Sequence, residues 1–211
     1  HTRFKCDWSS DVCSSDRAAL CGGDRGAGYT RDAEAIKAAL PGLFRLDSGF
    51  FKAATETGAQ PDVWGTAFAV YIGALAPNDE EAARAALAEA LRRGTLSWKG
   101  AIRHVPTDRD FSRDSAWEIC YAAKNRYQNG AYWDTPVGWI VYAVCKEAPD
   151  AARDLVKEYI AQLREDDFRL GGEHGAPWEC RHPEDNHRQN PIYLASVSCP
   201  LAAIRKAMGE Q

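Results

Sequence analysis

The feature that most constrains the fold is a proline followed by an apolar run, which occurs three times. These runs begin at Pro61, Pro136 and Pro191. Proline suits the first position of a helix, because its missing N–H would have no partner there. Thr135 and Asn190, which precede two of the prolines, are favourable N-cap residues. The first two runs are apolar nearly all round, which is typical of a helix buried on several sides. The sequence therefore predicts three inner helices.

Each of the first two inner helices is followed by an amphipathic one. These two cover 79–93 and 150–165, and both have acids in the first turn and arginine in the last, as the helix dipole favours. An outer helix is also expected at 32–40, and a short hairpin arm at 96–105. Alternating inner and outer helices define an α/α toroid. We therefore expect an all-α fold that forms about half of an (α/α)6 barrel over residues 31–211; a free-standing six-helix bundle is the alternative.

The start of the chain does not resemble natural protein. Residues 7–16 read DWSSDVCSSD, a ten-residue match to the translation of a common sequencing adapter. We therefore expect residues 1–16 to be a non-native tail that takes no part in the fold. Residues 17–30 are glycine-rich and are expected to form a loop. Because the chain has no initiator methionine, we also expect the natural protein to extend further upstream.

Composition excludes some classes of function. The net charge is −4, whereas a nucleic-acid binder usually has a basic face. No apolar run is long and pure enough for a membrane span. Of the seven cysteines, those outside the expected tail are scattered and odd in number, which favours free thiols and a reducing, cytoplasmic compartment. We expect no nucleic-acid or membrane partner, and the oligomeric state stays open.

The connections between the expected helices differ in length. Those at 76–78 and 147–149 are short, whereas those at 94–134 and 166–189 are long. Long connections in a compact domain are usually functional or disordered, and these are rich in tryptophan, tyrosine and glycine, which does not suit disorder. Both would meet at the end of the toroid where the inner helices begin. That end is the expected place for a site.

The two long connections carry side chains of the kinds that bind sugars. Flat aromatic rings stack on sugar rings, and amides and carboxylates hydrogen-bond to hydroxyl groups. The expected substrate-binding residues are Tyr127, Gln128, Asn129, Tyr132, Trp133, Asp134, Trp178 and His182. The alternative for the aromatic residues is that they only close the end of the barrel.

Two carboxylates are candidates for catalysis. Inverting glycoside hydrolysis uses two carboxyl groups roughly 6.5–9.5 Å apart, one as acid and one as base. Glu179 and Glu173 are the candidates for one of the pair; a solvated loop residue is the alternative for each. His174, Cys180, His182 and His187 are close in sequence but match no standard zinc spacing. We therefore expect neither a metal nor a cofactor.

Three segments resemble the six-hairpin glycosidases, the (α/α)6-barrel glycoside hydrolases. They are PDVWGTAFAVYIGAL at 61–75, YQNGAYWDTPVGW at 127–139 and PWECRHPEDNHRQNPIYLASVSCPLAA at 177–203. In trehalase-like members a glutamate in a late loop, followed by proline and a turn, supplies the general base, and Glu179 matches it. Arg181 and Asn186 depart from that pattern. The resemblance implies the C-terminal half of such an enzyme, with the general acid in the missing half.

The expected function is therefore glycoside hydrolysis, with inversion, by a parent enzyme acting on an oligosaccharide or glycoside. By itself the 211-residue chain is expected to be inactive. A sugar epimerase or polysaccharide lyase is one alternative, and it would use histidines such as His104, His174 and His182. A non-catalytic helical domain that binds carbohydrate or protein is the other.

Overall fold

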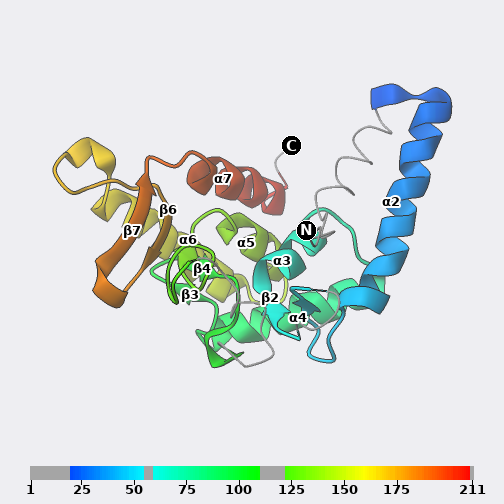
Figure 1. Ribbon diagram of the computed structural model, residues 1–211, viewed down its shortest axis with the longest axis horizontal. Coiled ribbons are helices and arrows are strands. Elements are labelled where there is room, and N and C mark those ends of the chain that lie inside the picture. Colours follow the sequence, from blue (N-terminus) through cyan, green and yellow to red (C-terminus); the bar gives the residue numbers. More distant parts are fainter. Residues whose placement is uncertain (1–19, 55–58, 110–121, 210–211) are drawn as a thin grey trace.

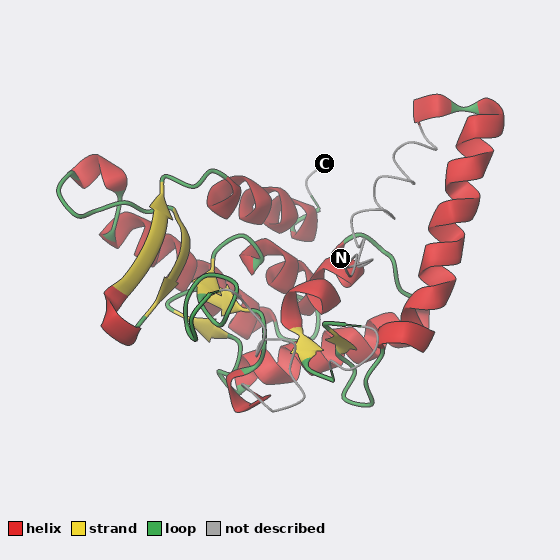
Figure 2. Ribbon diagram, viewed as in Figure 1, coloured by secondary structure: helices red, strands yellow, loops and turns green. Residues whose placement is uncertain are grey.

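The computed structural model of the chain describes residues 20–54, 59–109 and 122–209. Within these ranges lie six α-helices and two antiparallel β-sheets. Figure 2 distinguishes the helices from the strands by colour. The fold is therefore mixed α/β, and the expectation of an all-α toroid with an α/α-barrel, six-hairpin architecture is wrong. The tail expected at 1–16 lies outside the described residues.

The helices follow the expected amphipathic pattern more closely than the expected start positions. They are α2 (Gly23–Phe44), α3 (Val63–Tyr71), α4 (Pro77–Arg92), α5 (Val137–Val144), α6 (Pro149–Glu165) and α7 (Ala195–Ala207). Pro77 and Pro149 are the prolines that stand at the first helical position. Pro61 instead lies in a strand, and Pro136 is the N-cap of α5. Asp62, not a residue before the proline, caps α3 by accepting a hydrogen bond from the backbone N–H of Gly65.

Helix α2 includes the outer helix expected at 32–40 and is longer than that at both ends. Residues 23–30, part of the expected loop at 17–30, are helical. In Figure 1 this helix projects from one side of the molecule, and the largest sheet lies at the opposite side. Only a few of its side chains, among them Leu40 and Phe44 near its C-terminal end, are buried.

Helix α5 is the centre of the helical part. It packs against α3, α4, α6 and α7, and its apolar side chains belong to one continuous core. Arg84 of α4 is buried and donates hydrogen bonds to the backbone oxygens of Tyr142 and Ala143, at 3.1 and 2.8 Å. These oxygens lie at the C-terminal end of α5, where backbone carbonyls have no partner within the helix. The amphipathic helix α4 therefore also caps its neighbour.

The two sheets are built mostly from the segments expected to be long loops. The small sheet pairs β1 (Phe51–Lys52) with β2 (Pro61–Asp62). The five-stranded sheet has the order β3 (Ser97–Trp98), β4 (Ala101–Arg103), β5 (Tyr132–Trp133), β6 (Trp178–His182) and β7 (His187–Pro191). The hairpin expected at 96–105 is confirmed as β3–β4, and it forms one edge of this sheet.

The sheet escaped the sequence analysis because its strands lack the usual pattern. Strands of two or three residues are too short to show alternation, and β6 and β7 read WECRH and HRQNP, which are polar sequences. Their pairing is long-range: Tyr132 pairs with Arg181, and Trp133 with Cys180. Within the described ranges, no helix is both long and apolar enough to cross a membrane.

Candidate functional site

Glu179 in β6 is a buried carboxylate with an unusual set of partners. Its side chain is 5% exposed. The side-chain amide of Asn190 donates a hydrogen bond to its Oε2, and the hydroxyl of Tyr193 is hydrogen-bonded to it as well. Among the residues that the structure describes, no lysine, arginine or histidine forms an ion pair with it. Burying a carboxylate without a counter-charge is costly, so Glu179 is the leading candidate for a functional group.

The β6–β7 hairpin explains how Glu179 meets these partners. Trp178 pairs with Pro191 and Cys180 with Gln189, which places Asn190 opposite Glu179. Asn190 and Ile192 have positive φ angles of 49° and 58°, so the chain turns sharply as β7 ends. Backbone hydrogen bonds from Ile192 to Gly175 and from Tyr193 to Pro177, at 3.0 and 2.8 Å, fix this turn. The turn brings the ring of Tyr193 back toward β6.

A cluster of aromatic rings adjoins the carboxylate. Trp133 packs against Cys180, Tyr127 and Trp64, with centroid distances of 5.2 Å to Tyr127 and 5.3 Å to Trp64. Its indole N–H donates a hydrogen bond to the backbone oxygen of Tyr127 at 3.2 Å. His104 stacks on Trp64 at 3.2 Å between ring centroids. Burial lowers the pKa of His104 to about 3, so its imidazole is neutral at physiological pH.

The polar groups around Glu179 keep their protons. Burial, followed by the nearby charge of Glu179, raises the pKa of both Tyr127 and Tyr193. Their hydroxyls therefore act as hydrogen-bond donors rather than as bases. The same two causes raise the pKa of the Cys180 thiol to about 12, which rules out a thiolate nucleophile at neutral pH. Glu179 is thus a carboxylate surrounded by neutral groups.

Four of the expected sugar-binding residues are buried, and three of them, besides Trp133, have partners elsewhere in the fold. Asp134 is 1% exposed and forms an ion pair of 2.9 Å with Arg181. Arg181 is itself 4% exposed. Asn129 is buried and donates a hydrogen bond to the backbone oxygen of Ala122. Tyr132 is also buried, and its ring stacks on His182 at 5.7 Å between centroids. These contacts give them a structural role.

The other expected residues are divided between the site and its surroundings. Trp178 is half-buried, and its indole N–H donates a hydrogen bond to Asp166. His182 is half-buried, and burial lowers its pKa. Gln128 and Glu173 are exposed. Of the expected residues, the structure brings Tyr127 and Trp133 together with Glu179, and it does not bring Glu173 there.

Four further residues of the site were not predicted as substrate-binding residues. Asn190 was expected to be the N-cap of a helix and Tyr193 to lie in that helix. Trp64 was expected in a buried inner helix, and His104 was considered only for the alternative chemistry. Asn190 is exposed and Tyr193 half-buried. The available signal was the run of polar residues directly after Glu179, because a hairpin in that run would bring some of them beside the Glu179 carboxylate.

Asp62 is a second carboxyl group in an unusual setting. Burial raises its pKa to about 6, although hydrogen bonds from the backbone of Gly65 and Trp64 oppose this. It caps α3 beside Trp64, and the N–H of Val63 donates to the backbone oxygen of His104 at 2.7 Å. The start of α3 is thereby attached to the end of β4. Its hydrogen bonds identify Asp62 as a helix cap.

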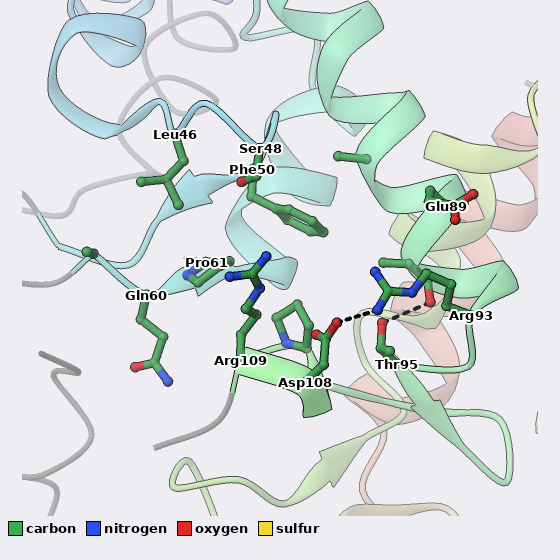
Figure 3. A pocket seen from close by; sticks show the side chains of 14 residues that line it. Leu46, Ser48, Phe50, Gln60, Pro61, Glu89, Arg93, Thr95, Asp108 and Arg109 are labelled. Carbon is green, nitrogen blue, oxygen red and sulfur yellow. Dashed lines mark hydrogen bonds and ion pairs between the residues drawn. The ribbon is translucent and has the colours of Figure 1, made fainter. Parts of the chain in front are cut away.

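A cavity of about 600 Å³ lies away from these residues, between α4 and the segments around β1 and β2 (Figure 3). An ion pair of 2.9 Å joins Arg93, after the end of α4, to Asp108 on its rim. Gln60 contributes to its wall, is 3% exposed, and has no hydrogen-bond partner for its side chain within the described structure. None of the expected catalytic or binding residues lines this cavity.

No group of three or more histidine, cysteine, aspartate and glutamate side chains that could hold a metal ion occurs in the part of the chain that the structure describes. Comparison with known proteins assigns no family. No protein-family model matches the chain, and no curated protein matches it.

Proposed function

We propose that this chain carries the general base of a carbohydrate-processing enzyme, a glycoside hydrolase that works with inversion. The observation that supports the proposal is the environment of Glu179, a buried carboxylate held by Asn190 and Tyr193 and lacking an ion pair within the described residues. A structural carboxylate at that depth is normally paired, as Asp134 is with Arg181. A carboxylate buried without such a partner is costly to the fold, which makes Glu179 a candidate for a chemical role.

In the proposed reaction Glu179 accepts a proton from a water molecule as the water oxygen attacks the anomeric carbon. The bond from that carbon to the leaving oxygen breaks, and a separate carboxylic acid protonates the leaving oxygen. Asn190 and Tyr193 hold the carboxylate in one orientation, because both are hydrogen-bonded to it. The half-exposed ring of Tyr127, packed on Trp133, provides the apolar surface that a sugar ring requires.

The test is Glu179→Gln in the protein as its organism makes it, assayed on a panel of aryl α- and β-glycosides and on disaccharides. Glutamine keeps the shape but cannot accept the proton, so kcat is expected to fall by a factor of at least about 100. Glu173→Gln is the matched control, because Glu173 is exposed and lines a cavity to which Glu179 does not contribute; it should leave kcat unchanged.

Each other outcome contradicts the proposal in a specific way. Wild-type turnover that survives Glu179→Gln but is lost in His182→Gln would favour an epimerase or a lyase that uses histidine. Saccharide binding by a wild-type protein that turns over none of the panel would favour a non-catalytic carbohydrate-binding domain. An equal loss of kcat in the Glu173→Gln control would mean that the assigned carboxylate is wrong.

A further inference from the structure

The cavity of about 600 Å³ between α4 and the segments around β1 and β2 has a largely apolar wall. We refer to it as the α4–β1 cavity. Its apolar wall residues include Leu46, Phe50, Pro61, Ala90 and Pro106, and Figure 3 shows the ring of Phe50 directed into the open space. Small-molecule sites occupy roughly 300–1,000 Å³. The cavity is therefore large enough for a small organic molecule that carries an apolar group.

Four charged side chains line the α4–β1 cavity, and three of them have partners. Arg93 is paired with Asp108 at 2.9 Å. Glu89 lies 3.7 Å from Arg92, which is outside the wall. Arg109 has no ion pair and no side-chain hydrogen bond among the residues that the structure describes. The cavity therefore presents one unpaired positive charge beside its apolar wall.

The backbone holds Arg109 at the rim of this cavity. Arg109 ends a short 3-10 helix, η1 (Thr107–Arg109). The N–H of Thr107 donates a hydrogen bond to the backbone oxygen of Thr95 at 2.9 Å, which attaches η1 to the segment that follows α4. In Figure 3 the Arg109 side chain extends into the same open space as the ring of Phe50. Because Arg109 is exposed, a ligand that enters the cavity can reach it.

We propose that the α4–β1 cavity binds a small monocarboxylate with an apolar group, an aromatic or branched-chain acid. The guanidinium of Arg109 donates two parallel hydrogen bonds to the carboxylate, and the apolar group packs against Phe50 and its neighbours. One unpaired cation balances one negative charge. A phosphate dianion would bring a second charge close to the carboxylates of Asp108 and Glu89, which line the same cavity. The site is independent of Glu179, which does not line the cavity.

The experiment is a fluorine NMR titration of para-fluorophenylacetate with the whole chain. The fluorine signal of this carboxylate is expected to shift saturably. Its neutral isostere, para-fluorophenylacetamide, should bind about fivefold more weakly, which is the upper range for the loss of an ion pair at an exposed position. Acetate lacks the apolar group and inorganic phosphate carries the wrong charge, so neither should displace the probe at equal concentration.

Variants of Arg109 test its part in binding. Arg109→Gln removes the charge, so it should weaken binding of the carboxylate about fivefold and leave binding of the amide unchanged. Arg109→Lys keeps the charge and loses the paired donors, so it should weaken carboxylate binding less. Arg164→Gln is the matched control, because Arg164 in α6 is also exposed and lies outside the cavity wall; it should change neither affinity.

The outcomes separate this proposal from the catalytic one. Glu179→Gln should leave carboxylate binding unchanged, so failure of the catalytic proposal is distinguishable from failure of this one. The proposal is overturned if the carboxylate does not bind saturably, if the amide binds as tightly as the carboxylate, or if binding is insensitive to Arg109→Gln. Displacement by acetate or phosphate at equal concentration would also contradict it, because the cavity would then recognise any small anion.

Discussion

At the scale of single residues, two buried carboxylates of the same sheet region have opposite settings. Asp134 has a cationic partner at 2.9 Å, whereas Glu179 is held by an amide and a phenol. A carboxylate that serves only the fold gains from a counter-charge. Burial raises the pKa of Asp134 even though the charge and hydrogen bond of Arg181 oppose this, so the difference between the two carboxylates lies in their partners. The contrast favours a structural role for Asp134 and a chemical role for Glu179.

The pairing of Asp134 leads to a stability prediction. Asp134→Asn leaves the buried guanidinium of Arg181 without its counter-charge, and breaking such a pair costs about 3–5 kcal/mol. Urea denaturation should therefore show a large fall in the free energy of unfolding. Asp154→Asn is the control, because the pair between Asp154 and Lys157 has the same length of 2.9 Å but is exposed, and its loss should cost less than about 1 kcal/mol. Equal effects would show that Arg181 does not need Asp134.

The sequence alone could not distinguish the role of Asp134 from that of Glu179. Asp134 was expected to bind hydroxyls because it follows Tyr132 and Trp133, yet its partner Arg181 lies in a distant strand. Glu179 was found through its resemblance to a family pattern, but its setting depends on Asn190 and Tyr193, which were expected to lie in a helix. The residue types indicated carboxylate chemistry. Which carboxylate is free of a cationic partner depends on contacts between segments far apart in the sequence.

At the scale of elements, helix α7 packs closely on α5. A Cβ at Gly138 of α5 would lie 2.6 Å from the backbone oxygen of Pro200 and 2.7 Å from its Cα. The absence of a side chain at Gly138 is what allows the backbones to approach. Pro200 lies inside α7 and has no N–H, so that helix can bend at the contact.

We therefore predict that Gly138→Ala destabilises the protein by about 1–3 kcal/mol, because overpacking forces the backbones apart. Gly42→Ala is the matched control. Gly42 also lies in a helix, α2, and a Cβ there would meet no atom within 4 Å, so the better helix propensity of alanine should stabilise the protein slightly. Thermal unfolding measures both. A neutral or stabilising Gly138→Ala would mean that α5 and α7 have room to separate.

How well each element could be predicted depends on how local its cause is. Helices α4 and α6 begin and end within two residues of the expected positions, because amphipathic spacing and charged ends are local signals. Helix α7 was expected to start at Pro191 and starts at Ala195. Asn190–Pro191 has the local chemistry of a helix start, but Pro191 pairs with Trp178. The strand partner outweighs the local preference.

At the scale of the whole molecule, one junction links the helical part to the sheet. Asp62 caps α3, and His104 follows β4; the N–H of Val63 donates to the backbone oxygen of His104, and Trp64 stacks on its ring. Burial raises the pKa of Asp62 from 3.8 to about 6 and lowers that of His104 from 6.5 to about 3. Both shifts favour the neutral form, but they affect stability with opposite signs.

Between about pH 4 and pH 6 the folded protein holds the Asp62 proton that the unfolded chain has released, so this group destabilises the fold as pH rises. Over the same window the unfolded chain protonates His104 and the folded protein does not, so this group destabilises the fold as pH falls. Each contributes a slope of at most about 1.4 kcal/mol per pH unit. Together the two slopes nearly cancel in the wild type.

Removing one group should reveal the slope of the other. Asp62→Asn retains the helix cap, and relative to the wild type its stability should fall as pH is lowered from 6 to 4. His104→Phe keeps a flat ring against Trp64, and its relative stability should fall as pH is raised from 4 to 6. Urea titrations at half-unit pH intervals measure both differences, with Asp154→Asn as the control, since that carboxyl is exposed. Differences that stay constant over the window would mean that the junction is hydrated in solution, because both shifts have burial as their main cause.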